Sequence, residues 1–244
     1  MNLVGKRCLV TGGAIRVGRA LVELLADRGA RVAFTYRSSR DAALELQRQL
    51  SGAGVEAHAL PCELSDAEGV ARLIAECRAL WGGVDVLINN ASLFRRTPLT
   101  DATLDDWDDQ MNANLRAPWL LSQAFGPEMK ERGEGIILNM LDIAAERPYP
   151  GYLPYCASKA GLVALTKGLA RVLAPEVRVN GIAPGTVLWP DDYPEEQKQR
   201  TLAKTPMRGV GSPEDIAAAA RYLIEDAPFV TGVVLPVDGG RLLV

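Results

Sequence analysis

The sequence predicts an α/β protein built on one doubly wound parallel sheet with helices on both faces. Seven short apolar runs of the strand type alternate along the chain with six helical patterns. No linker and no internal repeat divides the 244 residues. Chains of this length commonly fold as one α/β unit, so we expect residues 1–244 to form a single domain.

The first half of the chain alternates regularly between strand and helix. Gly29 is suited to end the first helix, and Ser65, followed three residues later by Glu68, predicts a helix N-cap at Ser65. We expect strands at 6–11, 31–36, 55–60 and 84–89, and later helices at 41–50 and 65–80.

The second half has longer helices and one long connection. Ser212 and Pro213 are typical of a helix start, and Pro175 of a helix end. Residues 183–207 are too long for an ordinary connection, which predicts a substrate-binding loop with short helices of its own. We expect helices at 107–130 (bent near Pro118) and 152–174, and strands at 135–139, 177–182 and 233–237.

Composition argues against several classes of protein. The chain has 27 Lys and Arg against 30 Asp and Glu, a net charge of −3, which favours neither nucleic acid nor an anionic membrane as a partner. No apolar run approaches the roughly 20 residues that span a bilayer, and the first residues read as a strand, not a signal peptide. The single histidine, His58, argues against a metal site. Four cysteines without a CxxC pair predict reduced thiols in a cytoplasmic protein: Cys8, Cys62, Cys77 and Cys156.

The segment 11–18 (TGGAIRVG) is a glycine-rich turn between the first strand and the first helix. Glycine lets the backbone approach a ligand closely, and the free N–H groups of a helix N-terminus bind phosphate. In this position the pattern is typical of a Rossmann-like dinucleotide site. Arg16 replaces the middle glycine usual in such loops, and can pair with phosphate or extend into the active site.

The end of the second strand indicates which dinucleotide binds. An acidic residue there would hold the ribose 2′-hydroxyl of NAD. The chain instead has Tyr36, Arg37 and Ser38, and a guanidinium beside hydroxyl groups suits the 2′-phosphate of NADPH. Glu63 ends the third strand, where its carboxylate can accept from the adenine amino group.

Tyr155 and Lys159 lie four residues apart, which places both side chains on one face of a helix. A phenol has an ordinary pKa of about 10, and a cation one turn away stabilises its anion. With Asp142 upstream, these side chains would form a proton-transfer site. The alternative is an ordinary Tyr–Lys pair on an exposed helix face.

These segments together resemble the short-chain dehydrogenase/reductase family over essentially the whole chain. The resemblance implies that Tyr155 is the proton donor, that Lys159 lowers its pKa and holds the nicotinamide ribose, and that Asn114 supports a water-linked proton relay. It also implies a homotetramer or a dimer. The motifs are the glycine loop, Asn89-Asn90-Ala91, Asn114, Tyr155 with Lys159, Arg178-Val179-Asn180, Pro184-Gly185 and Asp238-Gly239-Gly240.

The resemblance implies a cofactor site that is assembled from segments far apart in the chain. It consists of Gly12, Ile15, Arg16, Val17, Tyr36, Arg37, Ser38, Glu63, Leu64, Asn90, Ala91, Ser92, Tyr155, Lys159, Pro184, Gly185 and Val187.

Three departures from the common family pattern resemble the pteridine reductases. Asp142 stands where the family usually has a carbonyl-binding serine, Arg16 lies in the glycine loop, and Phe94 ends an NNAS-x-F motif. The resemblance implies NADPH-dependent reduction of dihydromonapterin, dihydrobiopterin or dihydrofolate to the tetrahydro form, with no metal. The substrate site would consist of Arg16, Ser92, Phe94, Asp142, Tyr152 and Tyr155.

Other interpretations stay open at this point. Phe94 is also compatible with simple packing, and Asp142 with a loop cap. The second functional hypothesis is an NADPH-dependent carbonyl reductase, such as a 3-oxoacyl-carrier-protein reductase, which would favour a serine at position 142. A third is a non-catalytic nucleotide-sensing protein, which the presence of Tyr155, Lys159 and Asn114 argues against.

Overall fold

The computed structural model describes residues 1–189 and 194–244. It confirms the predicted fold class, because seven parallel strands form one sheet in the order β3-β2-β1-β4-β5-β6-β7. The strands are β1 (Arg7–Val10), β2 (Arg31–Tyr36), β3 (Ala57–Pro61), β4 (Val86–Asn89), β5 (Gly135–Met140), β6 (Val177–Pro184) and β7 (Val234–Val237).

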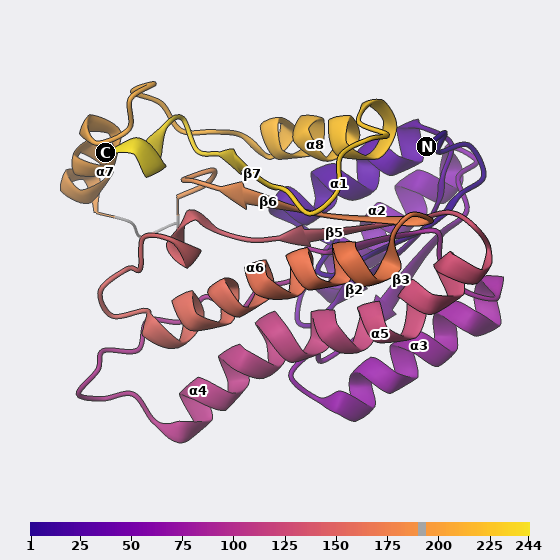
Figure 1. Cartoon of the computed structure of the whole chain (residues 1–244), viewed down its shortest axis with the longest axis horizontal. Coiled ribbons are helices and arrows are strands. Elements are labelled where there is room, and N and C mark those ends of the chain that lie inside the picture. The colour runs from indigo at the N-terminus through magenta and orange to yellow at the C-terminus, as the bar shows by residue number, and fades with distance from the viewer. Residues whose placement is uncertain (190–193) are drawn as a thin grey trace.

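Helices cover both faces of the sheet. In Figure 1, α1 and α8 lie together on one side, and α3, α5 and α6 lie on the other. Each side has its own apolar core, with Phe34 and Leu21 fully buried in the first and Phe125 and Leu73 in the second. The helices are α1 (Arg16–Asp27), α2 (Arg40–Gly52), α3 (Ala67–Trp81), α4 (Leu104–Met111), α5 (Ala117–Glu131), α6 (Leu153–Leu173), α7 (Glu195–Ala203) and α8 (Pro213–Arg221).

The single helix predicted at 107–130 is wrong in two respects. It begins earlier, at Leu104, where Thr103 and Asp106 form a capping box. It is also interrupted by a π-helical segment, η1 (Asn112–Arg116), which lies just before the predicted bend at Pro118. Pro118 has no N–H to offer the carbonyl of Asn114, and a π segment is one way for a helix to accommodate that loss.

Two predicted helix starts had different outcomes. Ser65 is not the N-cap of α3, because the carboxylate of Asp66 accepts from the backbone N–H groups of Glu68 and Gly69. The Ser65 hydroxyl donates instead to Glu63. Ser212 caps α8 as predicted, in a capping box with Asp215.

The segment 183–207 begins inside β6 and contains α7, so it has a helix of its own as predicted. Figure 1 shows α7 beside the C-terminus. Four residues of the predicted substrate loop, 190–193, lie outside the described part of the chain.

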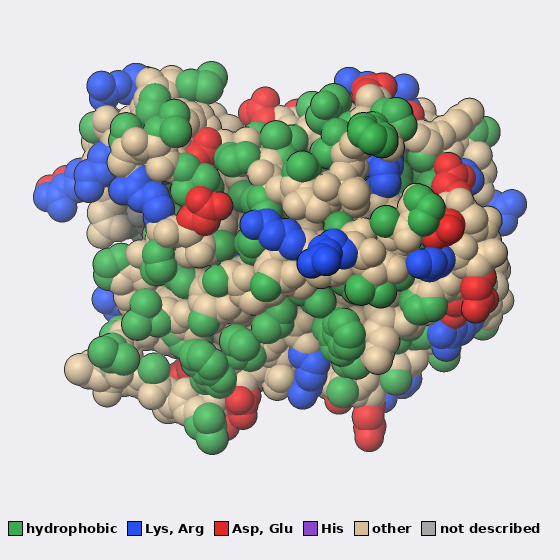
Figure 2. All heavy atoms as spheres, in the orientation of Figure 1, with side chains coloured by type: hydrophobic (Ala, Val, Ile, Leu, Met, Phe, Trp, Pro, Cys, Tyr) green, Lys and Arg blue, Asp and Glu red, His purple; other side chains and the backbone are tan. Residues whose placement is uncertain are grey.

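The surface carries charges of both signs, and hydrophobic side chains reach it between them (Figure 2). Helices α4, α5 and α6 expose Trp107, Trp119 and Val172. This surface is compatible with the expected homotetramer, which stays a prediction. No helix in the described part of the chain is long and apolar enough to cross a membrane.

The four cysteines form no disulfide, and the histidine packs against an aromatic ring. All four cysteines are free and buried. His58 packs edge-on against Trp81, with the ring centroids 5.7 Å apart. Among the described residues, no group of three or more His, Cys, Asp or Glu side chains could hold a metal ion.

Candidate active site

A cleft of about 510 Å³ lies along the carboxyl ends of the strands, where parallel α/β sheets bind ligands. All the residues expected to bind the cofactor line it, from Gly12 after β1 to Val187 after β6. Six of the eight expected substrate or catalytic residues line it, namely Arg16, Ser92, Phe94, Asp142, Tyr155 and Lys159. Asn114 and Tyr152 lie outside its wall.

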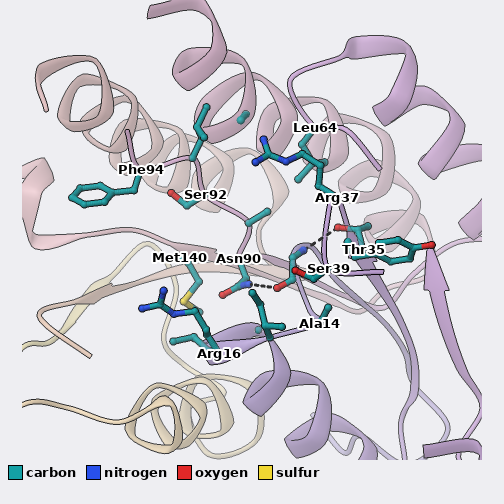
Figure 3. A pocket seen from close by; sticks show the side chains of 18 of the residues that line it. Ala14, Arg16, Thr35, Arg37, Ser39, Leu64, Asn90, Ser92, Phe94 and Met140 are labelled. Carbon is teal, nitrogen blue, oxygen red and sulfur yellow. Dashed lines mark hydrogen bonds between the residues drawn. The ribbon is translucent and has the colours of Figure 1, made fainter. Parts of the chain in front are cut away.

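The glycine loop is fastened to both neighbouring strands. The Gly12 N–H donates to the Thr35 hydroxyl at 2.9 Å, and the Asn90 side chain donates to the carbonyls of Thr11 and Gly12 (Figure 3). A Cβ at Gly18 would lie 2.0 Å from the Gly12 carbonyl oxygen, so only glycine allows this close approach. The loop therefore presents a fixed backbone to the cleft.

Arg16 begins α1 with a φ of 55°, a left-handed conformation that most side chains avoid. This explains why glycine is usual at this position, and it indicates local strain at the mouth of the cleft. The guanidinium donates to the Leu188 carbonyl at 3.5 Å, so Arg16 connects the glycine loop to the segment after β6.

The two ends of the cleft differ in chemistry. Figure 3 shows Arg37 and Thr35 at one end and Phe94 with Ser92 at the other. Arg37 is exposed, and its guanidinium lies 3.9 Å from the Glu63 carboxylate. An exposed, solvated cation beside the hydroxyl groups after β2 fits a 2′-phosphate, because little must be desolvated before an anion binds.

Tyr155 and Lys159 are both buried, which rules out the surface-pair interpretation. The Tyr155 hydroxyl donates to Asp142 Oδ2 at 2.7 Å. The Lys159 ammonium donates to the Met140 carbonyl at 2.7 Å and lies 5.7 Å from the centre of the Tyr155 ring. Strand β5 and helix α6 thus bring a phenol, a cation and a carboxylate together.

The expected lowering of the Tyr155 pKa is wrong in this structure. Burial raises the pKa of the Tyr155 phenol well above its ordinary value, and the charge of Asp142 raises it further. Burial also lowers the pKa of Lys159 to about 8, against the opposing effect of Asp142. Tyr155 therefore keeps its proton at neutral pH, which is the form needed to donate one.

Asn114 is fully buried in η1, and protein atoms already contact its side-chain amide. Its oxygen accepts from the Leu93 N–H at 2.7 Å, and its nitrogen donates to the Leu93 carbonyl and to the Ser158 hydroxyl. Ser158 in turn donates to the Tyr155 carbonyl at 2.6 Å. These contacts hold the loop after β4 against α6; the proton relay stays a prediction.

Phe94 is half exposed, and its ring stacks on Tyr152 with the centroids 4.3 Å apart and the planes within 6°. Its other ring contact is edge-on, with Tyr155 at 4.7 Å. Tyr152 therefore supports one face of the Phe94 ring and is not among the residues that line the cleft; its role in substrate binding stays a prediction.

Asp142 makes more contacts than the sequence indicates. Besides Tyr155, its carboxylate accepts from the Ala144 N–H at 2.7 Å and from the Tyr149 hydroxyl at 3.2 Å. Asp142 is thus both a loop cap and a partner of the buried tyrosine. Sequence reasoning missed Tyr149. The sequence gives only one indication of its role, namely that it is a second aromatic residue, besides Tyr152, between Asp142 and α6.

Comparison with known proteins agrees with the fold and the site. Residues 13–241 match a family model described as enoyl-(acyl carrier protein) reductase. The chain is 37% identical to dehydrogenase/reductase SDR family member 4 of Pongo abelii, over 98% of this chain and 88% of that protein. It is 33% identical to the 3-oxoacyl-[acyl-carrier-protein] reductase FabG of Staphylococcus aureus (strain Mu50), over 98% of both chains.

Two solved structures are similar over nearly the whole chain. One is a blue fluorescent protein from a metagenomic library, in complex with NADPH, with a TM-score of 0.92, 36% identity and 99% coverage of both chains. The other is a putative short-chain alcohol dehydrogenase from Sinorhizobium meliloti, with a TM-score of 0.92, 34% identity and coverage of 99% and 98%.

Fold and site together define an oxidoreductase of the α/β nucleotide-binding type. The chain belongs to the short-chain dehydrogenase/reductase family, as the sequence motifs predict. Three of the four proteins just described are named as dehydrogenases or reductases, and none of the four is named as a pteridine reductase.

Proposed function

We propose that this protein is an NADPH-dependent reductase that converts 7,8-dihydropterins, such as dihydromonapterin, dihydrobiopterin or dihydrofolate, to tetrahydropterins. Arg37 and Ser38 would hold the 2′-phosphate, and the glycine loop the pyrophosphate. The cofactor supplies a hydride when bound. The similar structure in complex with NADPH supports this cofactor.

The observation that carries the pterin proposal is the contact between Tyr155 and Asp142. Reduction of a C=N bond requires a proton at nitrogen, and a protonated phenol held by a carboxylate is a suitable donor. A carbonyl substrate would instead favour a neutral hydroxyl donor at position 142. An anion there repels the oxygen that becomes negative as hydride is added.

In this proposal the residues of the chain have separate tasks. The exposed ring of Phe94 supports one face of the flat pterin, and Tyr152 fixes the plane of that ring. Asp142 accepts from pterin N–H groups and orients Tyr155, which donates the proton. Lys159 is a buried cation that would hold the ribose of the cofactor.

A carbonyl reductase is the second candidate, and the comparisons favour it more than a pterin reductase. FabG of Staphylococcus aureus is named as a 3-oxoacyl-[acyl-carrier-protein] reductase, and it matches 98% of this chain. The site also offers one hydroxyl, since Ser92 lines the cleft and lies close enough to Tyr155 to lower its pKa against the larger effects of burial and of Asp142. Ser92 would then polarise a carbonyl oxygen in place of the missing serine.

One assay separates the two candidates. Oxidation of NADPH, and of NADH in parallel, is followed with dihydrobiopterin, dihydromonapterin, dihydrofolate and an acetoacetyl thioester, using the wild type and Asp142→Ser. We expect the wild type to prefer NADPH and a dihydropterin. Asp142→Ser should lower dihydropterin reduction by about 10- to 100-fold, because the tyrosine loses its carboxylate partner.

The thioester is the internal control for this assay. Asp142→Ser restores a hydroxyl where a carbonyl reductase needs one, so thioester reduction should stay constant or rise. Wild-type enzyme that reduces only the thioester, or an Asp142→Ser variant with unchanged dihydropterin turnover, would reject the pterin proposal in favour of the carbonyl reductase.

A further inference from the structure

The carboxylate of Asp142 lies between two phenols, which bind different oxygens. Tyr155 donates to Oδ2 at 2.7 Å, and Tyr149 donates to Oδ1 at 3.2 Å. The Ala144 N–H also donates to Oδ1, at 2.7 Å. Two donors thus hold one oxygen, and Tyr155 alone holds the other.

Tyr149 is itself held in place from three directions. Its backbone N–H donates to the Cys156 thiol sulfur at 3.3 Å, and its carbonyl accepts from the Tyr152 N–H at 3.1 Å. Its ring packs against the buried cluster of Leu141, Ile143, Leu162 and Ala183. The phenol therefore approaches Asp142 from a fixed position, supported by the start of α6 and by this cluster.

The two phenols cannot have the same task, because they differ in access to the cleft. Tyr155 lines the cleft beside Asp142, whereas Tyr149 is not part of its wall. Burial also raises the pKa of Tyr149 far above its ordinary value, with a further contribution from Asp142, so its hydroxyl stays a donor. Only Tyr155 can transfer a proton to a substrate, and Tyr149 is left to hold the carboxylate.

We infer that Tyr149 is a positioning residue, which keeps the carboxylate of Asp142 oriented when Tyr155 turns its proton toward the substrate. At that moment Oδ2 loses Tyr155 as its donor, and without Tyr149 the only donor that the described part of the chain still offers the carboxylate would be the Ala144 N–H. A donor that stays bound to the carboxylate fixes its rotation. This inference rests on the proposed catalytic roles of Asp142 and Tyr155.

A double-mutant cycle tests this role. Tyr149→Phe removes only the hydroxyl, and we expect it to lower kcat by about 10-fold, the effect of losing one hydrogen bond to a charged group, with the affinity for NADPH unchanged. In an Asp142→Asn background the same change should alter kcat by less than about twofold, because the carboxylate that accepts the hydrogen bond from Tyr149 is no longer present.

Two controls make the cycle decisive. Tyr222→Phe removes an exposed phenol on the far helix segment η3 and should leave kcat unchanged in both backgrounds. Phe keeps the ring that packs against the Leu141 cluster; if Tyr149→Phe nevertheless fails to fold, Tyr149→Leu is measured in its place. An equal loss of kcat in both backgrounds, or no loss in either, would overturn the positioning role.

The outcome is separable from that of the substrate proposal. The cycle is run with whichever substrate the wild type reduces, since the contacts of Tyr149 involve only protein atoms. A wild type that reduces only the thioester rejects the pterin, and an additive cycle rejects the role of Tyr149. Neither result implies the other.

Discussion

The two ends of the sheet contain buried or half-buried charges that have opposite effects on stability. At the amino end, Arg7 and Asp85 form an ion pair between β1 and the residue before β4, with three hydrogen bonds from Arg7 to the carboxylate. Arg7 also donates to the Trp81 carbonyl, and Arg132 lies 3.5 Å from Asp85. The hydrogen bonds from Arg7 outweigh the effect of burial and hold the pKa of Asp85 below its ordinary value.

At the carboxyl end, burial destabilises the charged form of the side chain. Lys159 is fully buried, its ammonium contacts a neutral carbonyl, and its pKa falls to about 8. Arg16 adopts a left-handed backbone conformation at the mouth of the same cleft. Charges at the amino end stabilise the fold, whereas those at the carboxyl end are kept despite a cost in stability, which is typical of functional sites.

We expect the largest effect for a substitution at the carboxyl end, where Tyr155 is the proposed proton donor. Tyr155→Phe removes the proton donor and should lower turnover by about 10²- to 10⁴-fold, while the affinity for NADPH survives. Steady-state kinetics and a fluorescence titration with NADPH measure the two quantities. Turnover close to that of the wild type would remove Tyr155 from the mechanism and leave the carboxyl end without its main functional residue.

We expect the second largest effect at the amino end, on the stability of the fold. Asp85→Asn leaves the half-buried Arg7 without its carboxylate and should lower the free energy of unfolding by about 2 kcal/mol, or the Tm by roughly 5 °C, with kcat unchanged. Glu196→Gln is the matched control, because the pair of Glu196 with Arg200 is exposed and should contribute less than about 1 kcal/mol. A loss of kcat in Asp85→Asn would show that the two ends are coupled.

The same contrast explains how much the sequence could predict. The strands, their alternation with helices and the glycine loop follow from local patterns, and they place every expected cofactor residue along one cleft. Such patterns fix which residues reach the carboxyl ends of the strands, since parallel strands all end at the same edge. They do not fix which partner each side chain meets there.

Tyr155 and Tyr152 illustrate that limit. The i, i+4 spacing predicts that Lys159 lies near Tyr155, but burial and the carboxylate of Asp142 set the direction of the Tyr155 pKa shift. Tyr152 is one turn away on the same segment, yet it stacks behind Phe94 and not in the cleft. Burial and contacts between distant segments decide both cases, and a single sequence does not contain them.

The smallest effect that we expect is a gain in stability at the carboxyl end. The pKa of Lys159 is about 8 in the folded protein, and an unperturbed lysine titrates near 10.4. Between these values the unfolded chain binds more protons, so wild-type stability rises with pH through that window, and below pH 8 the burial cost is fully present. Lys159→Met fills the same volume without the charge, at the loss of one hydrogen bond to Met140.

Lys159→Met should therefore unfold in urea with a free energy about 1 kcal/mol higher than the wild type at pH 7, and the gain should shrink as the pH rises toward 10. The measurement is made without cofactor, because NADPH would stabilise the two proteins differently. A variant that is less stable at pH 7, or a gain that does not depend on pH, would mean that Met140 and its neighbours solvate the buried ammonium as well as water does. The carboxyl end would then resemble the amino end, and the contrast between the two would be lost.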